Sequence, residues 1–166
     1  MIDKEVFKVV LGKLMLVVFI CGLLISAIFY LNRRWEDIRD IRRRADAAAI
    51  TKALDYYNFQ FGQFPENFDD DGQGWDKSND PVERTFLEPM TKIGLLSTLV
   101  FDPKNDETHY YRYQRFEGGA FGCERPYAIF QVNSFESESD RPGRGSCPEI
   151  DWTKQAPNGY TWFSLE

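Results

Sequence analysis

The sequence predicts an α+β protein in which one long N-terminal helix packs on a small antiparallel β-sheet. Three observations lead to this prediction. An uncharged apolar run is followed by a charged segment, 31–61, that contains no Gly or Pro and has apolar residues at helical spacing. Further along the chain, several stretches are rich in aromatic and β-branched residues, which favour strands. We therefore expect half of the helix in a membrane and half against a sheet.

Residues 14–31 contain no charged side chain, and 18 residues of helix are enough to cross a hydrocarbon layer roughly 30 Å thick. Each Leu, Ile, Val or Phe in such a run contributes roughly −0.3 to −0.6 kcal/mol to insertion. A cleaved secretory signal is shorter and ends at small residues, whereas this run continues into NRRWEDIRDIRRR. We predict a short flank or leader at 1–13 and a retained transmembrane helix at 14–32.

Residues 33–62 are predicted to continue the helix as an amphipathic extension, because Gly62 and then Pro65 supply the first stop signals. A helix over 14–61 would extend roughly 70 Å, which is far more than a bilayer requires. Its outer half must therefore rest on a folded domain. Apolar residues at three- and four-residue spacing predict one stripe on this extension, and its main members are Ile38, Ile41, Ala45, Ala48, Leu54 and Tyr57.

Residues 63–166 are predicted to form one α+β domain. A short helix is expected within 81–93 and strands within 109–116 and 127–135, with an edge strand at 159–165. In the second strand Ala128, Phe130 and Val132 alternate with Ile129 and Gln131. We expect the first set to cover the helix stripe and the opposite face to stay partly exposed.

Charge and cysteine content restrict the partners and the compartment. From residue 33 onward there are 24 acidic and 17 basic side chains, a net charge of −7, which repels a phosphate backbone and makes nucleic acid an unexpected partner. Cys123 and Cys147 are spaced to close a loop of about 25 residues, and such a bridge persists only outside the reducing cytoplasm. Two free thiols are the alternative.

The stretch RRRADAAAITKALDYYNFQFGQFPENF resembles the helix-to-loop junction of type IV pilin-like proteins, most of all the major pseudopilins of type II secretion systems. The family element ALxxYxxxxGxYP is matched by Ala53, Leu54, Tyr57, Gly62, Phe64 and Pro65, and the family segment LPxDPxN by Asp102, Pro103 and Asn105. The resemblance implies a pilin-like fold, anchored in the cytoplasmic (inner) membrane with its domain outside the cytoplasm. The arginines after residue 32 favour the opposite orientation by the positive-inside rule; the resemblance and the cysteine pair lead us to expect an extracytoplasmic domain.

The N-terminus departs from that family. Its members carry a leader ending in Gly, which prepilin peptidase removes, and a Glu at the fifth mature position. Here Gly12 and Lys13 are the processing candidates, and Val17 stands at the fifth position after them. The peptidase is therefore a partner only if the chain is processed.

Two functions follow from these observations. In the first, the chain is a structural subunit of a type IV pilus-like or type II secretion pseudopilus filament, which can extend to the cell surface, and the helix stripe packs against copies of itself or other pilin-like subunits. In the second, it is a non-polymerising single-pass membrane protein whose pilin-like domain acts as an adaptor or binding module. Membrane lipid is a partner in both.

Enzymatic function is not expected, because no Ser or Cys has a recognisable spacing to His109, the only histidine. No cofactor is expected beyond calcium, for which one loop is a weak candidate. Asn67, Asp69 and Asp71 alternate like the first ligands of a calcium loop, but Ser78 stands where the closing Glu belongs. A solvated acidic loop is the alternative interpretation.

Overall fold

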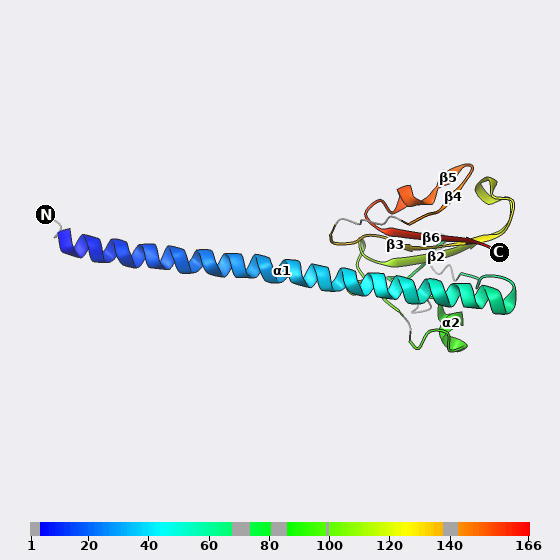
Figure 1. The fold of residues 1–166 in the computed structure, drawn as a ribbon, viewed down its shortest axis with the longest axis horizontal. Coiled ribbons are helices and arrows are strands. Elements are labelled where there is room, and N and C mark those ends of the chain that lie inside the picture. Colours follow the sequence, from blue (N-terminus) through cyan, green and yellow to red (C-terminus); the bar gives the residue numbers. More distant parts are fainter. Residues whose placement is uncertain (1–3, 68–73, 81–85, 99, 138–142) are drawn as a thin grey trace. The chain divides into compact units, whose positions relative to one another are not determined.

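The computed structural model describes residues 4–67, 74–80, 86–98, 100–137 and 143–166, with side chains from residue 11 onward. The protein is α+β, as predicted: a long N-terminal helix and a small four-stranded antiparallel sheet (Figure 1). The chain forms two compact units, Met1–Ile38 and Arg39–Glu166. The second unit contains the last part of the helix and the whole sheet.

Helix α1 runs from Lys4 to Phe61, so it begins ten residues before the predicted start. It ends where the sequence predicts. Gly62 has a φ of 73°, and its N–H donates to the Asn58 carbonyl at 2.8 Å, as expected of a residue that closes a helix in the left-handed region. The stretch Leu11–Phe61 contains an 18-residue window of mean hydropathy 2.8, none of it buried. By length and composition α1 is a candidate membrane span.

The sheet has the order β1-β2-β3-β6, and every neighbouring pair is antiparallel. Its strands are β1 (Asp76–Lys77), β2 (Tyr111–Phe116), β3 (Tyr127–Val132) and β6 (Tyr160–Leu165). The three longer strands fall within the predicted stretches, and β6 lies at an edge as predicted. The short helix α2 (Glu88–Lys92) lies within the predicted range 81–93. The remaining elements are η1 (Ala120–Gly122), β4 (Ser146–Cys147), β5 (Ile150–Asp151) and η2 (Trp152–Gln155).

The larger core lies between the C-terminal part of α1 and one face of the sheet (Figure 1). From α1, Ile50 and Leu54 are completely buried. The sheet contributes buried side chains of β2 and β3, and loops contribute more; the principal ones are Tyr111, Tyr113, Ala128, Phe130, Val132, Phe64, Phe86 and Met90. Full burial of a large apolar side chain stabilises a protein by about 1.5–3 kcal/mol, so this packing holds the last turns of α1 on the sheet.

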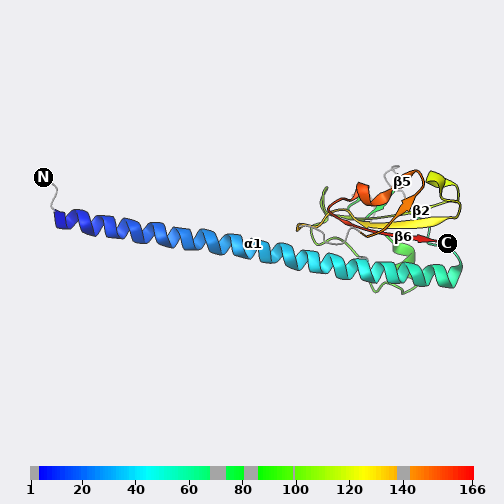
Figure 2. The same ribbon diagram turned by 45° about the horizontal axis from the view of Figure 1, so that its top comes forward.

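The opposite face of the sheet is also covered, and the prediction that it stays partly exposed is wrong. All six residues of β3 are buried. Residues 143–156 cross this face, which lies away from α1 in both views (Figures 1 and 2), and Trp152 packs there with Tyr127 and Ile129. Alternation within a strand shows which residues share a face, but it cannot show that a segment of irregular structure later in the chain folds over that face.

Candidate interaction surface

Within Arg39–Glu166, the helix α1 has two opposite faces. Successive residues of an α-helix turn by about 100°, so a set spaced by three and four residues stays on one face. The inner face contacts the rest of the unit and consists of Asp40, Arg43, Ala47, Ile50, Leu54 and Tyr57, all buried or half-buried. The outer face, about 200° away, is exposed and consists of Ile41, Ala45, Ala48, Lys52, Tyr56 and Phe59. Phe59 is 87% exposed.

The predicted single stripe is therefore wrong, because it joined residues from both faces. Leu54 and Tyr57 belong to the inner face, whereas Ile41, Ala45 and Ala48 belong to the outer face. Ile38, the last residue of the first unit, is 51% exposed. The alanines between residues 45 and 53 caused the error. They occupy several adjacent positions and therefore lie on both faces of the helix, so the three- and four-residue spacing can pass from one face to the other.

A buried ionic network fixes the start of the inner face. The Arg43 guanidinium is fully buried and contacts three carboxylates. It forms a bidentate pair with Asp102, at 2.6 Å from Nε to Oδ2 and 2.9 Å from Nη2 to Oδ1. Its Nη1 donates to Asp40 at 2.7 Å and to Glu136 at 2.8 Å. Arg39 Nε adds a second hydrogen bond to Glu136, at 2.6 Å.

The three carboxylates are fixed by further contacts. Asp102 Oδ1 accepts the N–H of Lys104 at 2.8 Å, so the predicted turn at Asp102 presents its carboxylate to the helix. Asp40 Oδ2 accepts both the N–H and the hydroxyl of Ser137, at 2.9 and 2.6 Å. Together these contacts link α1 to two loops that are distant in sequence.

The network also determines how its acids titrate. Hydrogen bonds from Arg39 and then Arg43 lower the pKa of Glu136 to about 2, against the opposing effect of burial. Burial disfavours ionisation of Asp40, but hydrogen bonds from Ser137 and from the Glu136 N–H outweigh it and lower the Asp40 pKa. Both acids are therefore ionised at neutral pH, as a structural role for Arg43 requires.

The structure joins Cys123 and Cys147 in a disulfide with a Cα–Cα distance of 5.2 Å. This bond connects the β2–β3 loop to the segment 143–156, which crosses the face of the sheet opposite α1. Cys21, the remaining cysteine, is free and exposed. The spacing in the sequence left the bridge and the free thiols equally open, and only the approach of two distant loops distinguishes them.

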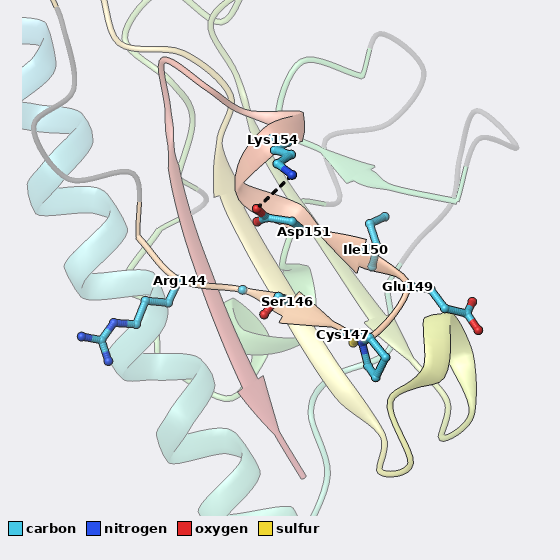
Figure 3. A pocket seen from close by; sticks show the side chains of 9 residues that line it. Arg144, Ser146, Cys147, Glu149, Ile150, Asp151 and Lys154 are labelled. Carbon is cyan, nitrogen blue, oxygen red and sulfur yellow. Dashed lines mark ion pairs between the residues drawn. The ribbon is translucent and has the colours of Figure 1, made fainter.

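An open depression of about 550 Å³ lies beside this disulfide (Figure 3). Asp151 and Lys154 form an ion pair within it at 3.8 Å, and Asp151 Oδ1 also accepts the Thr153 hydroxyl at 2.6 Å. Arg144 and Glu149 point to opposite sides of the depression (Figure 3). The charged groups therefore do not converge on a common point, and we assign no chemistry to this depression.

The calcium candidates are only partly within the described residues. Asn67 Nδ2 donates to the Gly74 carbonyl at 2.9 Å, whereas Asp69 and Asp71 lie outside the described residues. Ser78, at the closing position, donates to Asn105 at 2.8 Å. In the described part of the chain, no group of three His, Cys, Asp or Glu side chains is placed to hold a metal.

The processing candidates Gly12 and Lys13 both lie inside α1 and are exposed. A Cβ added at Gly12 would meet no atom within 4 Å. Close packing within the chain therefore does not explain the glycine, and the helix continues through it.

Comparisons of the chain with models of known protein families, with curated proteins and with solved structures gave no match. Any function therefore has to be inferred from the chain itself. Its clearest feature is a helix held firmly by one face, through Arg43 and Leu54, while the opposite face exposes apolar side chains. Sequence analysis missed Arg43, because nothing in the run of three arginines at 42–44 distinguishes the buried one.

Proposed function

We propose that this chain is a membrane-anchored structural subunit that packs side by side with copies of itself or with related pilin-like subunits in a type IV pilus-like or type II secretion pseudopilus filament. The outer face of α1 is the contact surface. The role requires no catalysis, only a helix that neighbouring subunits bury.

The outer face is the observation that carries this proposal. Ile41 is 62% exposed and Tyr56 is 54% exposed, and Ala45 and Ala48 between them are also exposed. Large side chains at the ends and small ones in the middle allow a second helix to approach closely. A helix that is apolar on two opposite faces generally has a partner on each, and the domain supplies only one of them.

The disulfide supports a location outside the cytoplasm. A bond between Cys123 and Cys147 is stable in oxidising compartments and rare in the cytosol. It supports our proposal that the domain lies on the extracytoplasmic side of the cytoplasmic (inner) membrane and that α1 is the span, although the arginines that follow residue 32 favour the opposite orientation.

A non-polymerising adaptor is the second candidate, and the N-terminus favours it. Lys13 follows the only candidate cleavage glycine, and Val17 stands where the related filaments have a Glu. An uncleaved chain would stay in the membrane and use the same outer face, or another surface, to bind one partner.

Disulfide crosslinking in native membranes tests the filament proposal. In a Cys21→Ala background, Ala48→Cys on the outer face should give a crosslinked dimer, the largest species that one free cysteine per subunit can form. Gln60→Cys, which is exposed but lies about 120° from Ala48 around the helix, is the matched control. Dimers from both positions would indicate random collision, and the absence of a dimer from Ala48→Cys would contradict packing through the outer face.

The mature N-terminus separates the two candidates independently. Intact mass and N-terminal sequencing of protein from native membranes should show a chain that begins at Lys13 if it enters a filament by the usual processing. A chain that retains Met1 would contradict the filament proposal and leave the adaptor.

A further inference from the structure

Among the arginines that the structure describes in the domain, four are buried or half-buried: Arg39, Arg43, Arg112 and Arg115. Three of them bind carboxylates, since Arg39 and Arg43 contact Glu136 and Arg115 contacts Glu166 at 2.7 Å. Within the part of the chain that the structure describes, Arg112 makes no ion pair with an acid. It is thus the exception in a domain that carries seven more acidic than basic side chains.

Arg112 is held in place by neutral groups. Its Nε donates to Gln131 Oε1 at 2.7 Å, and its Nη2 donates to the Gln155 carbonyl at 3.3 Å. The centre of the guanidinium lies 4.4 Å from the centre of the Trp75 ring, a cation–π contact. The position of Arg112 is therefore fixed without a counterion.

The groups that hold Arg112 are themselves fixed. Gln131 Nε2 donates to the Trp152 carbonyl at 2.8 Å and to the Thr161 hydroxyl at 2.9 Å, so its amide oxygen is directed toward Arg112. Burial lowers the pKa of Arg112, and an interaction with Tyr110 partly opposes this effect. A guanidinium still remains ionised at neutral pH, and it has five N–H donors, of which the hydrogen bonds to Gln131, Gln155 and Tyr110 do not use all.

We propose that Arg112, stacked on Trp75, is a docking site for a carboxylate side chain of a protein partner. The planar guanidinium pairs with a carboxylate through two parallel hydrogen bonds. Lys77 lies directly opposite Arg112 on the neighbouring strand β1, so the two residues share one face of the sheet. Trp and Arg are also the residue types that dominate binding energy at protein interfaces.

Charge complementarity makes an acidic segment of protein the expected occupant. Elsewhere an acidic domain repels such a segment, so binding should be confined to this face. The depression of Figure 3 is lined by residues 144–151 and 154 and does not include Arg112. The site is thus a surface contact for a side chain and lies apart from the outer face of α1, so it does not depend on the proposed function.

The test uses the full chain in detergent micelles with 15N-labelled arginine and a hexaglutamate peptide as the probe. We expect a saturable shift of the Arg112 Nε–H signal, assigned by its loss in Arg112→Lys. Arg112→Gln should weaken peptide binding at least about tenfold, the loss expected for one charge-assisted pair. Arg144→Gln, which removes an exposed arginine of the same domain, is the matched control and should leave binding unchanged.

Three results would overturn the proposal. The Arg112 signal would not move on titration, it would move only together with all exposed arginines, or inorganic phosphate would shift it at the same concentration as the peptide. The last result would indicate a general anion site. Should Arg112→Gln fail to fold, as judged by near-UV circular dichroism, the titration of the unchanged protein still decides the question.

Discussion

The two faces of the sheet are covered in different ways. On one face α1 packs through a regular row of apolar side chains, and the buried Arg43 network fixes the start of its inner face. On the other face residues 143–156 contain only two-residue strands and a 3-10 turn. There the cover is held by a disulfide and by the rings around Trp152, including Phe116 at 5.0 Å between ring centres.

The two covering segments differ in how many of their backbone hydrogen bonds they form internally. A helix satisfies its own backbone hydrogen bonds, so it needs only side-chain contacts to bind the sheet. An irregular segment has few internal hydrogen bonds and a larger loss of conformational entropy on folding. A covalent link reduces that loss by restricting the unfolded chain. The following changes test this comparison, from the largest expected effect to the smallest.

Arg43→Ala should have the largest effect, lowering the free energy of unfolding by about 3–5 kcal/mol. It removes one partner of a buried network and leaves Asp40 and Asp102 without their cation. Urea denaturation in micelles, followed by tryptophan fluorescence, measures the change. Arg42→Ala removes a neighbouring exposed arginine whose ion pair with Asp46 is 3.7 Å long, and it should cost less than about 1 kcal/mol. Equal losses for the two variants would contradict the anchoring role of Arg43.

Replacing both Cys123 and Cys147 by Ser should lower the free energy of unfolding by about 3–4 kcal/mol, from the entropy of a loop with a sequence separation of 24 residues. The loss should be local as well. Amide hydrogen exchange should increase in 143–156 more than in the inner face of α1. Uniform acceleration throughout the domain would show that the two covers are not independent. Cys21→Ser is the control and should change neither quantity.

Two substitutions on α1 compare its faces directly. Leu54→Ala on the inner face, where the side chain is completely buried, should cost about 2–5 kcal/mol. Ile41→Ala on the outer face should change the stability of the dispersed subunit by no more than about 0.5 kcal/mol, yet it should reduce the crosslinking described above. A large loss of stability from Ile41→Ala would show that the outer face belongs to the fold of the single subunit.

Lowering the pH should weaken the contacts of the Arg43 network, which hold α1 against the rest of the domain. Glu136 and Asp40 have pKa values below those of the unfolded chain, so the folded state binds fewer protons. Their contribution is complete above about pH 4.5 and is lost as the pH falls toward 2. Glu136→Gln should flatten this part of the curve of unfolding free energy against pH. An unchanged acid limb in that variant would exclude Glu136 as a source of the pH dependence.

Several elements could be predicted from the sequence because their signals are local. The stop of α1 at Gly62, the three longer strands and the edge position of β6 all follow from nearby residues. The sequence did not distinguish the inner from the outer face of α1, because the alanines between residues 45 and 53 lie on both faces. Strand β1 and the pair β4–β5 have only two residues each, too few for any periodic pattern to reveal.

By itself the sequence determined the α+β class, the apolar run in α1 and the distribution of acidic charge, since these depend on composition and on periodicities of two and about four residues. The tertiary structure decided which arginine is fully buried and which acids contact it, and, within the described residues, which half-buried arginine makes no ion pair with an acid. Arg43 lies 59 residues from Asp102 and 93 from Glu136. Contacts over such separations depend on how the chain folds back on itself, and no local pattern records them.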